Sequence, residues 1–279
     1  NRAYVQQAVC SASRASLLTG CRPNSTGVDY PYSPWFNQTF IKKYKGIATH
    51  FAEQGFYTRT LGKIHHGPSD KGTTEKHYNA HEHYFVLAEN QHEGPKKKWT
   101  KLVKPWEHAD MPDDKYEDGR IANETIETIR RAVKQEKPFF ISPGFKKPHL
   151  PFVCPKKYYD MYSENDLELA PFPKRAANQP EFTISNQTGA SKWWKYPKTG
   201  IDAKNSKQLI RSYYACVSFV DAQIGKILDE LEAQNLMENT VIILWSDHGW
   251  HLGDHGMWGK GTNYEWAARA PLFAYSPDM

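Results

Sequence analysis

The feature that most constrains this chain is the stretch A-V-C-S-A-S-R-A-S-L-L-T-G at residues 8–20. Residues 13–18 are helix formers, and Gly20 follows where a helix would stop. Cys10 is therefore expected at or just before a helix N-terminus, where free N–H groups and the helix dipole favour an anion. Arg14, one turn further along, points to the same side. The stretch predicts a reactive sulfur, or a derivative of it, beside an anion site. A lone cysteine before a helix is also often a buried structural residue, and its position alone leaves that interpretation open.

The length of 279 residues is enough for one large domain or two small ones, and an apolar content of 39% can build a sizeable core. Lys and Arg exceed Asp and Glu by five (36 − 31), which favours solubility or an anionic substrate. Four cysteines are too few for a disulfide scaffold in such a chain. No run of 18 apolar residues occurs, so no membrane span is expected. Because Cys10 has almost no strand before it, the chain is expected to be a fragment that begins inside a domain.

Apolar and polar segments follow one another in an order typical of an α/β protein. Helical periodicity predicts helices over 46–54, 118–134 and 204–234, and short apolar runs predict strands over 56–61, 139–142, 240–245 and 271–275. The uninterrupted run 240–245 is typical of a central parallel strand. The polar segments 67–116 and 151–202 show no sustained period and are expected to be long functional loops. The order predicts a large, mostly parallel central sheet with helices on both faces.

Polar side chains follow the ends of three predicted strands: Lys63, His65, His66, His149, Asp247 and His248. Ligands of open α/β sheets bind beyond the carboxyl ends of the strands, so these residues are expected to converge at one edge. Asp247 and His248 offer a hard oxygen and an imidazole nitrogen, which suits a metal ion, although a turn Asp and a surface His are the alternative. The triplet Asp-His-Gly at residues 247–249 recurs at residues 254–256, but there it follows a polar turn, so we assign the metal to the first copy.

The string C-x-A-S-R followed by L-T-G resembles the modification signature of the type I sulfatases, in which the Cys is oxidised to formylglycine. The flanking residues 6–9 and 21–23 look most like the iduronate-2-sulfatase branch. The resemblance implies an alkaline phosphatase-like sandwich in the α/β class. Residues 1–279 would then form a single sulfatase catalytic domain that is incomplete at both ends, without its first strand and its C-terminal subdomain.

The same resemblance implies two additions to the chain. Cys10 would be converted by the formylglycine-generating enzyme, and Ca²⁺ would be bound by Asp247, His248 and the residue at position 10. The family's two consecutive acidic ligands would precede Asn1, so the metal site is expected to be incomplete and this truncated fragment inactive.

The resemblance also assigns roles around position 10. Lys63, in G-K-x-x-H, and Lys260, in G-K, resemble sulfatase lysines that neutralise sulfate oxygens, although either would otherwise be a solvated surface lysine. Arg14 and Lys63 would lower the cost of ionising a formylglycine hydroxyl, which attacks sulfur. Lys260 and His149 would stabilise or protonate the departing alkoxide.

The base that would expel sulfate is His66 by the spacing of the iduronate branch, with His65 as the alternative. The implied activity is hydrolysis of a sulfuric ester on a sulfated sugar, a uronic acid or a polysaccharide, with neither nucleic acid nor membrane as a partner. A phosphatase or phosphonate hydrolase of the same superfold and a catalytically incomplete carbohydrate-binding remnant are the alternatives. Family members are secreted, periplasmic or lysosomal, so the same is expected here.

Overall fold

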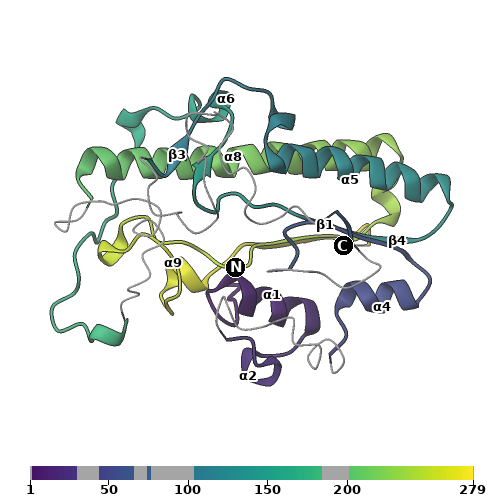
Figure 1. Ribbon diagram of the computed structural model, residues 1–279, viewed down its shortest axis with the longest axis horizontal. Helices are drawn as coiled ribbons and strands as arrows, with labels where there is room; N and C mark the ends of the chain where they lie inside the picture. Colours follow the sequence, from purple (N-terminus) through teal and green to yellow (C-terminus); the bar gives the residue numbers. More distant parts are fainter. Residues whose placement is uncertain (1, 30–43, 66–73, 77–103, 184–200, 279) are drawn as a thin grey trace, which may run out of the picture.

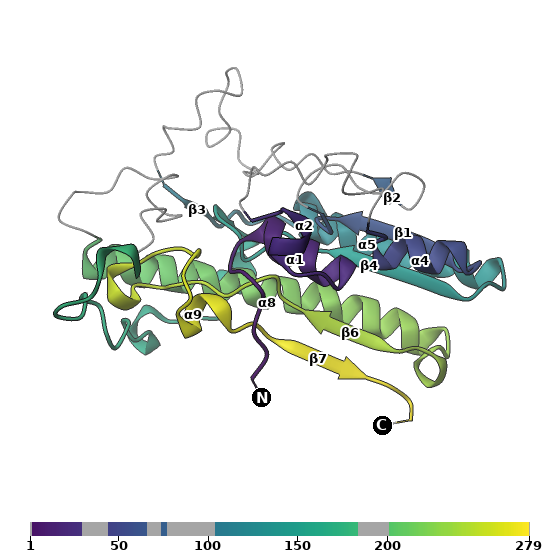
Figure 2. The same ribbon diagram turned by 90° about the horizontal axis from the view of Figure 1, so that it is seen from below.

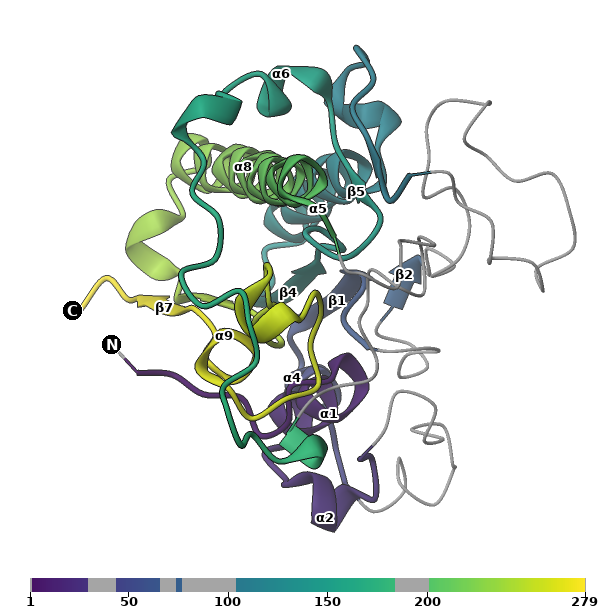
Figure 3. The same cartoon turned by 90° about the vertical axis from the view of Figure 1, so that its left-hand side faces the viewer.

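The structure is a computed structural model that describes residues 2–29, 44–65, 74–76, 104–183 and 201–278. Helices lie on both sides of a layer of strands (Figure 1). One side carries α5 (Glu117–Lys134) and α8 (Ala203–Ala233), and the other carries α1 (Cys10–Thr19) and α4 (Ile47–Glu53). Figure 3 shows the same layers end-on, with α8 and α5 above β4 and β1 and with α1 and α4 below. The expected placement of helices on both faces is confirmed.

Shorter helical segments connect these elements. They are α2 (Pro23–Thr26), α6 (Lys156–Tyr159), α9 (Glu265–Ala268) and single 3₁₀ turns at Asp113–Lys115, Glu164–Asp166, Glu181–Thr183, Met237–Asn239 and Asp254–Gly256. Several of them fall inside segments expected to be loops. Three parts of the segments 67–116 and 151–202, namely 67–73, 77–103 and 184–200, lie outside the described residues.

Strands occur in three groups within the described residues. β1 (Tyr57–Gly62) lies between β2 (Thr74–Lys76) and β4 (Phe139–Gly144) and is parallel to both. β3 (Trp106–Glu107) pairs with β5 (Phe152–Val153) in parallel. β6 (Ile242–Trp245) and β7 (Leu272–Tyr275) run side by side (Figure 2) and are antiparallel.

The ends of β1 and β4 meet closely. The register runs from Tyr57 opposite Phe139 to Gly62 opposite Gly144, so both strands end together. Gly62 has φ +68°, and a Cβ on it would overlap the Gly144 carbonyl oxygen, so only glycine fits there without strain. The Lys63 N–H donates to that same oxygen over 2.7 Å. Lys63 and the segment that carries His149 therefore leave the sheet at one edge, as the strand ends predicted.

The strand expected over 240–245 differs from its prediction in one respect. β6 pairs antiparallel with β7, and Ile243 and Leu244 are 53% and 39% exposed. An uninterrupted apolar run indicates that both faces of a strand can be buried, but it carries no information on the direction of the partner. The prediction of a central parallel strand is therefore wrong for the described residues, whereas the strand itself and its end at Trp245 are confirmed.

The main apolar core lies between α8, β5 and the segment around α6. Its buried members include Leu150, Phe152, Val153, Cys154, Tyr158, Leu209, Cys216 and Phe219. This packing fixes α8 and β5 against one another and so fixes the short segment that joins β4 to β5.

None of the helices in the described ranges combines the length and the apolar composition that a membrane span requires.

Candidate active site

Cys10 is the first residue of α1 and is 2% exposed. The N-cap residue Val9 has no side-chain acceptor, and the first turn contains no acidic residue. The positive end of the helix dipole is therefore not neutralised by a capping group, and it favours a negative charge at position 10. Gly20 ends the helix in the left-handed conformation, with φ 69°. The predicted start and end of this helix are confirmed.

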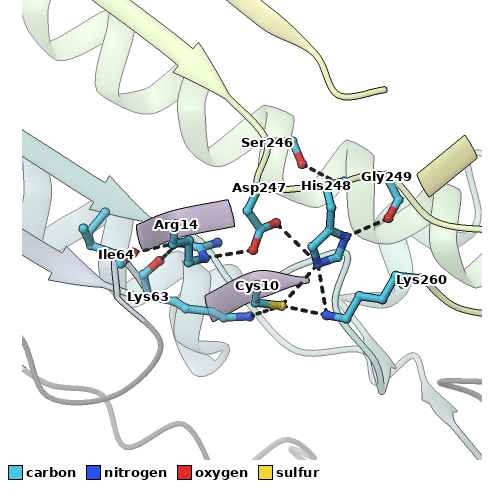
Figure 4. A network of polar contacts seen from close by, with 9 residues as sticks. All are labelled: Cys10, Arg14, Lys63, Ile64, Ser246, Asp247, His248, Gly249 and Lys260. Carbon is cyan, nitrogen blue, oxygen red and sulfur yellow. Dashed lines mark hydrogen bonds and ion pairs between the residues drawn. The ribbon is translucent and has the colours of Figure 1, made fainter. Parts of the chain in front are cut away.

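Three cationic or imidazole groups surround the sulfur of Cys10 (Figure 4). Lys260 Nζ lies 2.6 Å from Cys10 Sγ, His248 Nε2 lies 3.2 Å away and Lys63 Nζ lies 3.6 Å away. Burial alone would raise the pKa of the Cys10 thiol, but the charges of Lys63, Lys260 and His248 outweigh it and hold that pKa well below its usual value. The site therefore stabilises an anion on the atom attached to Cβ of residue 10. If formylglycine forms there, one of its oxygens takes the place of Sγ.

Arg14 joins three segments that are distant in sequence. Its Nε donates to Asp247 Oδ2 over 2.8 Å, and its Nη1 donates to the carbonyl oxygens of Lys63 and Ile64. A planar guanidinium holds five N–H donors in a fixed fork, so it can serve a carboxylate and two carbonyls at once. Burial opposes ionisation of Asp247, but Arg14 and His248 lower the pKa of this carboxyl to about 2. Asp247 is therefore an anion at neutral pH.

The two histidines that contact Cys10, His149 and His248, each bond the backbone carbonyl of the next residue through Nδ1. His248 Nδ1 donates to the Gly249 carbonyl oxygen over 2.7 Å, and His149 Nδ1 donates to the Leu150 carbonyl oxygen over 2.5 Å. A carbonyl can only accept, so the proton of each neutral ring sits on Nδ1 and Nε2 keeps its lone pair. In that neutral form each Nε2 is an acceptor, or a metal ligand, directed at position 10.

The charge state of His149 bears on its role. Burial and the neighbouring Lys63 and Lys260 lower the pKa of its ring to about 3, so it is neutral at physiological pH. Its side chain is hydrogen-bonded with Cys10. A neutral ring protonated at Nδ1 has a lone pair at Nε2, so in the substrate-free structure His149 can accept a hydrogen bond from position 10, and its role in proton transfer stays a prediction.

The donor atoms of Cys10, Asp247 and His248 all lie within 4.8 Å of one another, and within the described ranges they form the one such group of three. Ca²⁺ takes six to eight mostly oxygen ligands. The Asp247 carboxylate fits that preference and the Cys10 sulfur does not, whereas a formylglycine oxygen in its place does. The residues present thus fit one part of a calcium shell.

Of the two candidates for the second base, His65 and His66, only His65 lies within the described residues. His65 is buried at the end of the segment whose carbonyls bind Arg14, and its role stays a prediction. His66 lies outside the described residues.

Sequence reasoning missed Trp250, whose ring lies 5.8 Å from Lys260 Nζ, and it missed Asp118, whose contacts are described below. Two consecutive lysines usually lie on a solvated face, but Lys146 is 8% exposed and Lys147 is partly buried. No pattern in the sequence marks any of them.

Known proteins resemble this chain over almost its whole length. A family model described as "Sulfatase" matches residues 1–279. The iduronate 2-sulfatase of Mus musculus is 31% identical over 290 residues, which cover 99% of this chain and 52% of that protein. This chain therefore spans about half the length of the curated relatives it matches.

Two solved structures share the fold. The phosphonate monoester hydrolase SpPMH from Silicibacter pomeroyi superposes with a TM-score of 0.75 at 20% identity, covering 98% of this chain and 62% of that one. BT4656, solved in complex with its substrate D-glucosamine-2-N,6-O-disulfate, gives a TM-score of 0.73 at 19% identity, covering 100% and 64%. The fold is the alkaline phosphatase-like fold.

Proposed function

This chain belongs to the sulfatase family, and on that premise we propose that it carries the catalytic centre of a sulfuric ester hydrolase that removes sulfate from a sulfated sugar. The observation that supports the proposal most directly is the environment of Cys10. Its side chain begins a helix, is buried, and contacts two lysines whose charges favour an anion there, beside two histidines.

A formylglycine at position 10 would supply, as its hydrate, one hydroxyl that attacks sulfur and a second whose ionisation expels sulfate. Lys63 and Lys260 would lower the cost of placing negative charge on that oxygen, because their ammonium groups lie 3.6 and 2.6 Å from the atom it replaces. The same two charges would stabilise the anionic transition state. One preorganised donor of this kind contributes about 3–4 kcal/mol in enzymes where it has been removed.

Ca²⁺, when bound, would add a positive charge that polarises the sulfate ester and the oxygen at position 10. Asp247 and His248 would hold it, together with that oxygen. Arg14 keeps Asp247 ionised and, through the carbonyls of Lys63 and Ile64, holds the end of β1 beside it. Arg14 therefore acts on the metal side and on the lysine side of the centre.

His149 would accept the proton of a hydroxyl at position 10 through Nε2. Its neutral ring, with Nδ1 committed to the Leu150 carbonyl, supports this assignment. His66, with His65 as the alternative, remains the second candidate for a base, by its place after Lys63 in the sequence. Lys260 would also stabilise the departing alkoxide.

The substrate class rests on relatives. Iduronate 2-sulfatase and a structure holding a disulfated glucosamine are among the similar proteins, which supports a sulfated sugar. A phosphonate or phosphate monoester is the second candidate, because a multifunctional alkaline phosphatase superfamily protein from Trinickia caryophylli is 28% identical over 76% of this chain. We further propose that a formylglycine-generating enzyme acts on Cys10, and that the protein is secreted, periplasmic or lysosomal as expected for its family.

The test uses the natural full-length protein, produced together with a formylglycine-generating enzyme. Mass spectrometry of the peptide that contains residue 10 should show a loss of about 18 Da relative to cysteine. Sulfate release should then be measured on sulfated uronic acids and sulfated polysaccharides, beside a phosphonate monoester of matched leaving group. Conversion of Cys10 with turnover of the phosphonate alone would replace the sulfatase proposal by the second candidate.

A further inference from the structure

The segment Lys146–Pro151 joins β4 to β5 and carries His149 into the site. Among the described strands none pairs with its backbone groups, so other groups must satisfy them. The His149 N–H donates to the Lys146 carbonyl oxygen over 2.9 Å. Four further bonds come from two side chains that the proposed chemistry does not use, Asp118 and Lys147.

Asp118 lies in the first turn of α5 and is 1% exposed. Its Oδ1 accepts the N–H of Lys146 over 2.7 Å, and its Oδ2 accepts the N–H of Lys147 over 2.9 Å. A buried carboxylate is costly unless such bonds satisfy it, and here both oxygens are used on two consecutive peptide groups. Asp118 thus fixes the start of the segment to α5.

Lys147 fixes the other end. Its Nζ donates to the carbonyl oxygens of His149 over 3.1 Å and Pro151 over 2.6 Å. The ammonium therefore holds the backbone on both sides of Leu150 close to the side chain of Lys147. The N–H of His149 thus donates to Lys146, its carbonyl accepts from Lys147, and its ring Nδ1 donates to the Leu150 carbonyl. Nε2 is the one polar atom of His149 left to face Cys10.

From this arrangement we propose that Asp118 and Lys147 are positioning residues: they act through His149, by holding the segment in the fold that directs its Nε2 at position 10. Neither needs to touch the substrate. The adjacent Lys146 provides a contrast, because its Nζ pairs with Glu117 on α5 rather than with the carbonyl of His149.

The primary test reads the His149 ring directly and does not depend on sulfatase activity. In the full-length protein with ¹⁵N-labelled histidine at neutral pH, long-range ¹H–¹⁵N spectra report which ring nitrogen holds the proton. The His149 signals are identified by their loss in His149→Ala. The parent should show the Nδ1–H form. Lys147→Met frees the carbonyls of His149 and Pro151, so the Leu150 carbonyl between them is no longer held against Nδ1. His149 should therefore shift towards a mixture of both tautomers.

Two further variants keep the test decisive if Lys147→Met does not fold. Lys147→Gln removes the charge and shortens the side chain that now bonds two carbonyls, and Asp118→Asn keeps one acceptor oxygen in place of two, so both should move the His149 signals in the same direction. The matched control is Lys146→Met with Glu117→Gln, which removes an ion pair from the same segment and should leave the His149 signals unchanged. Unchanged His149 signals in folded Lys147 and Asp118 variants would overturn the proposal.

A second measurement rests on the proposed function. Lys147→Met should lower kcat for sulfate release about 10- to 100-fold with little change in KM, since a misdirected catalytic group costs about that much. In a His149→Ala background the same substitution should cost nothing further. An equal loss in both backgrounds would mean that Lys147 acts independently of His149. If the spectra respond as expected but no sulfate ester is hydrolysed, the proposed function fails and the positioning role stands.

Discussion

Arg14 and Asp247 form an ion pair in which Nε and Oδ2 are 2.8 Å apart, across 233 positions of the sequence, and each side chain is only 14% exposed. The pair connects α1, which carries Cys10, to the end of β6, which carries the proposed metal ligands. Removal of one partner leaves the other as an uncompensated buried charge, which is far more costly than the loss of a surface pair.

We therefore expect Arg14→Met to lower the free energy of unfolding by roughly 3 kcal/mol, measured by urea denaturation. Adding Asp247→Asn should restore part of the loss, since the unpaired carboxylate is then gone. Lys45→Met is the control: Lys45 pairs with Glu53 over a similar 2.7 Å, but the side chains are 66% and 45% exposed. That control should cost less than about 1 kcal/mol. Similar losses for Arg14→Met and Lys45→Met would contradict the assignment.

Cys10→Ala should abolish sulfate release by the full-length protein while the fold is retained, because position 10 is proposed to supply the nucleophile. The measurement is kcat on an activated aryl sulfate, with circular dichroism to monitor folding. Cys21→Ala is the matched control and should remain active, since the hydrogen bond described for its sulfur goes to the Thr19 carbonyl and not to a residue of the site. Retention of more than about one per cent of kcat by Cys10→Ala, a loss of under roughly 3 kcal/mol, would remove position 10 from the mechanism.

Removal of Ca²⁺ by a chelator should suppress sulfate release, and added Ca²⁺ should restore it. Asp247→Asn should weaken Ca²⁺ binding at least about tenfold in calorimetric titration, because it removes the one carboxylate among the three donor groups described here. Asp254→Asn, in the second copy of the triplet, should leave the affinity unchanged. Loss of Ca²⁺ binding in the Asp254 variant instead would move the metal to the second triplet.

His149→Ala tests whether this residue accepts or donates a proton. An acceptor for a hydroxyl at position 10 should matter equally whether the leaving group is a phenolate or a sugar alkoxide. We therefore expect kcat/KM to fall by a similar factor, about 100-fold, on an aryl sulfate and on a sugar sulfate. A far larger loss on the sugar sulfate would restore the donor role suggested by sequence, since an alkoxide needs protonation more than a phenolate does.

Stability should fall in mild acid because of buried neutral histidines. Burial lowers the pKa of His108 to about 3, from an unfolded value near 6.5. The unfolded chain therefore binds a proton that the folded chain does not, so the stability that His108 contributes is complete above pH 6.5 and is lost as the pH falls towards 3. His108→Gln should reduce the slope of unfolding free energy against pH by up to about 1.4 kcal/mol per unit between pH 6 and 4. Parallel slopes for parent and variant would contradict this.

The sequence predicted the elements well where an apolar period or a glycine defined them. The helix from Cys10 to Thr19, the strand ends at Gly62 and Gly144 and the long helix from Ala203 to Ala233 agree with expectation to within a few residues. These features are local, so a single sequence contains them.

What the sequence did not predict depends on contacts between distant segments. The antiparallel pairing of β6 depends on which strand lies beside it, and the buried positions of Lys146 and Asp118 depend on α5 meeting the end of β4. The neutral state of His149 likewise follows from burial beside two lysines that are 86 and 111 residues away in sequence (149 − 63 and 260 − 149). A pattern of residue types marks a histidine as a candidate but does not fix its charge.

The burial of Cys10 limits the period during which another protein can reach its side chain. The sulfur is covered in part by Lys260, which lies 250 positions later in the chain. At about 5–20 residues per second, a ribosome completes that interval roughly 10–50 s after it has placed Cys10. Throughout that period the residue cannot be enclosed by its final neighbours. An enzyme that must reach this side chain therefore has its opportunity during synthesis and before closure, and slower folding of the second half of the chain would lengthen that opportunity.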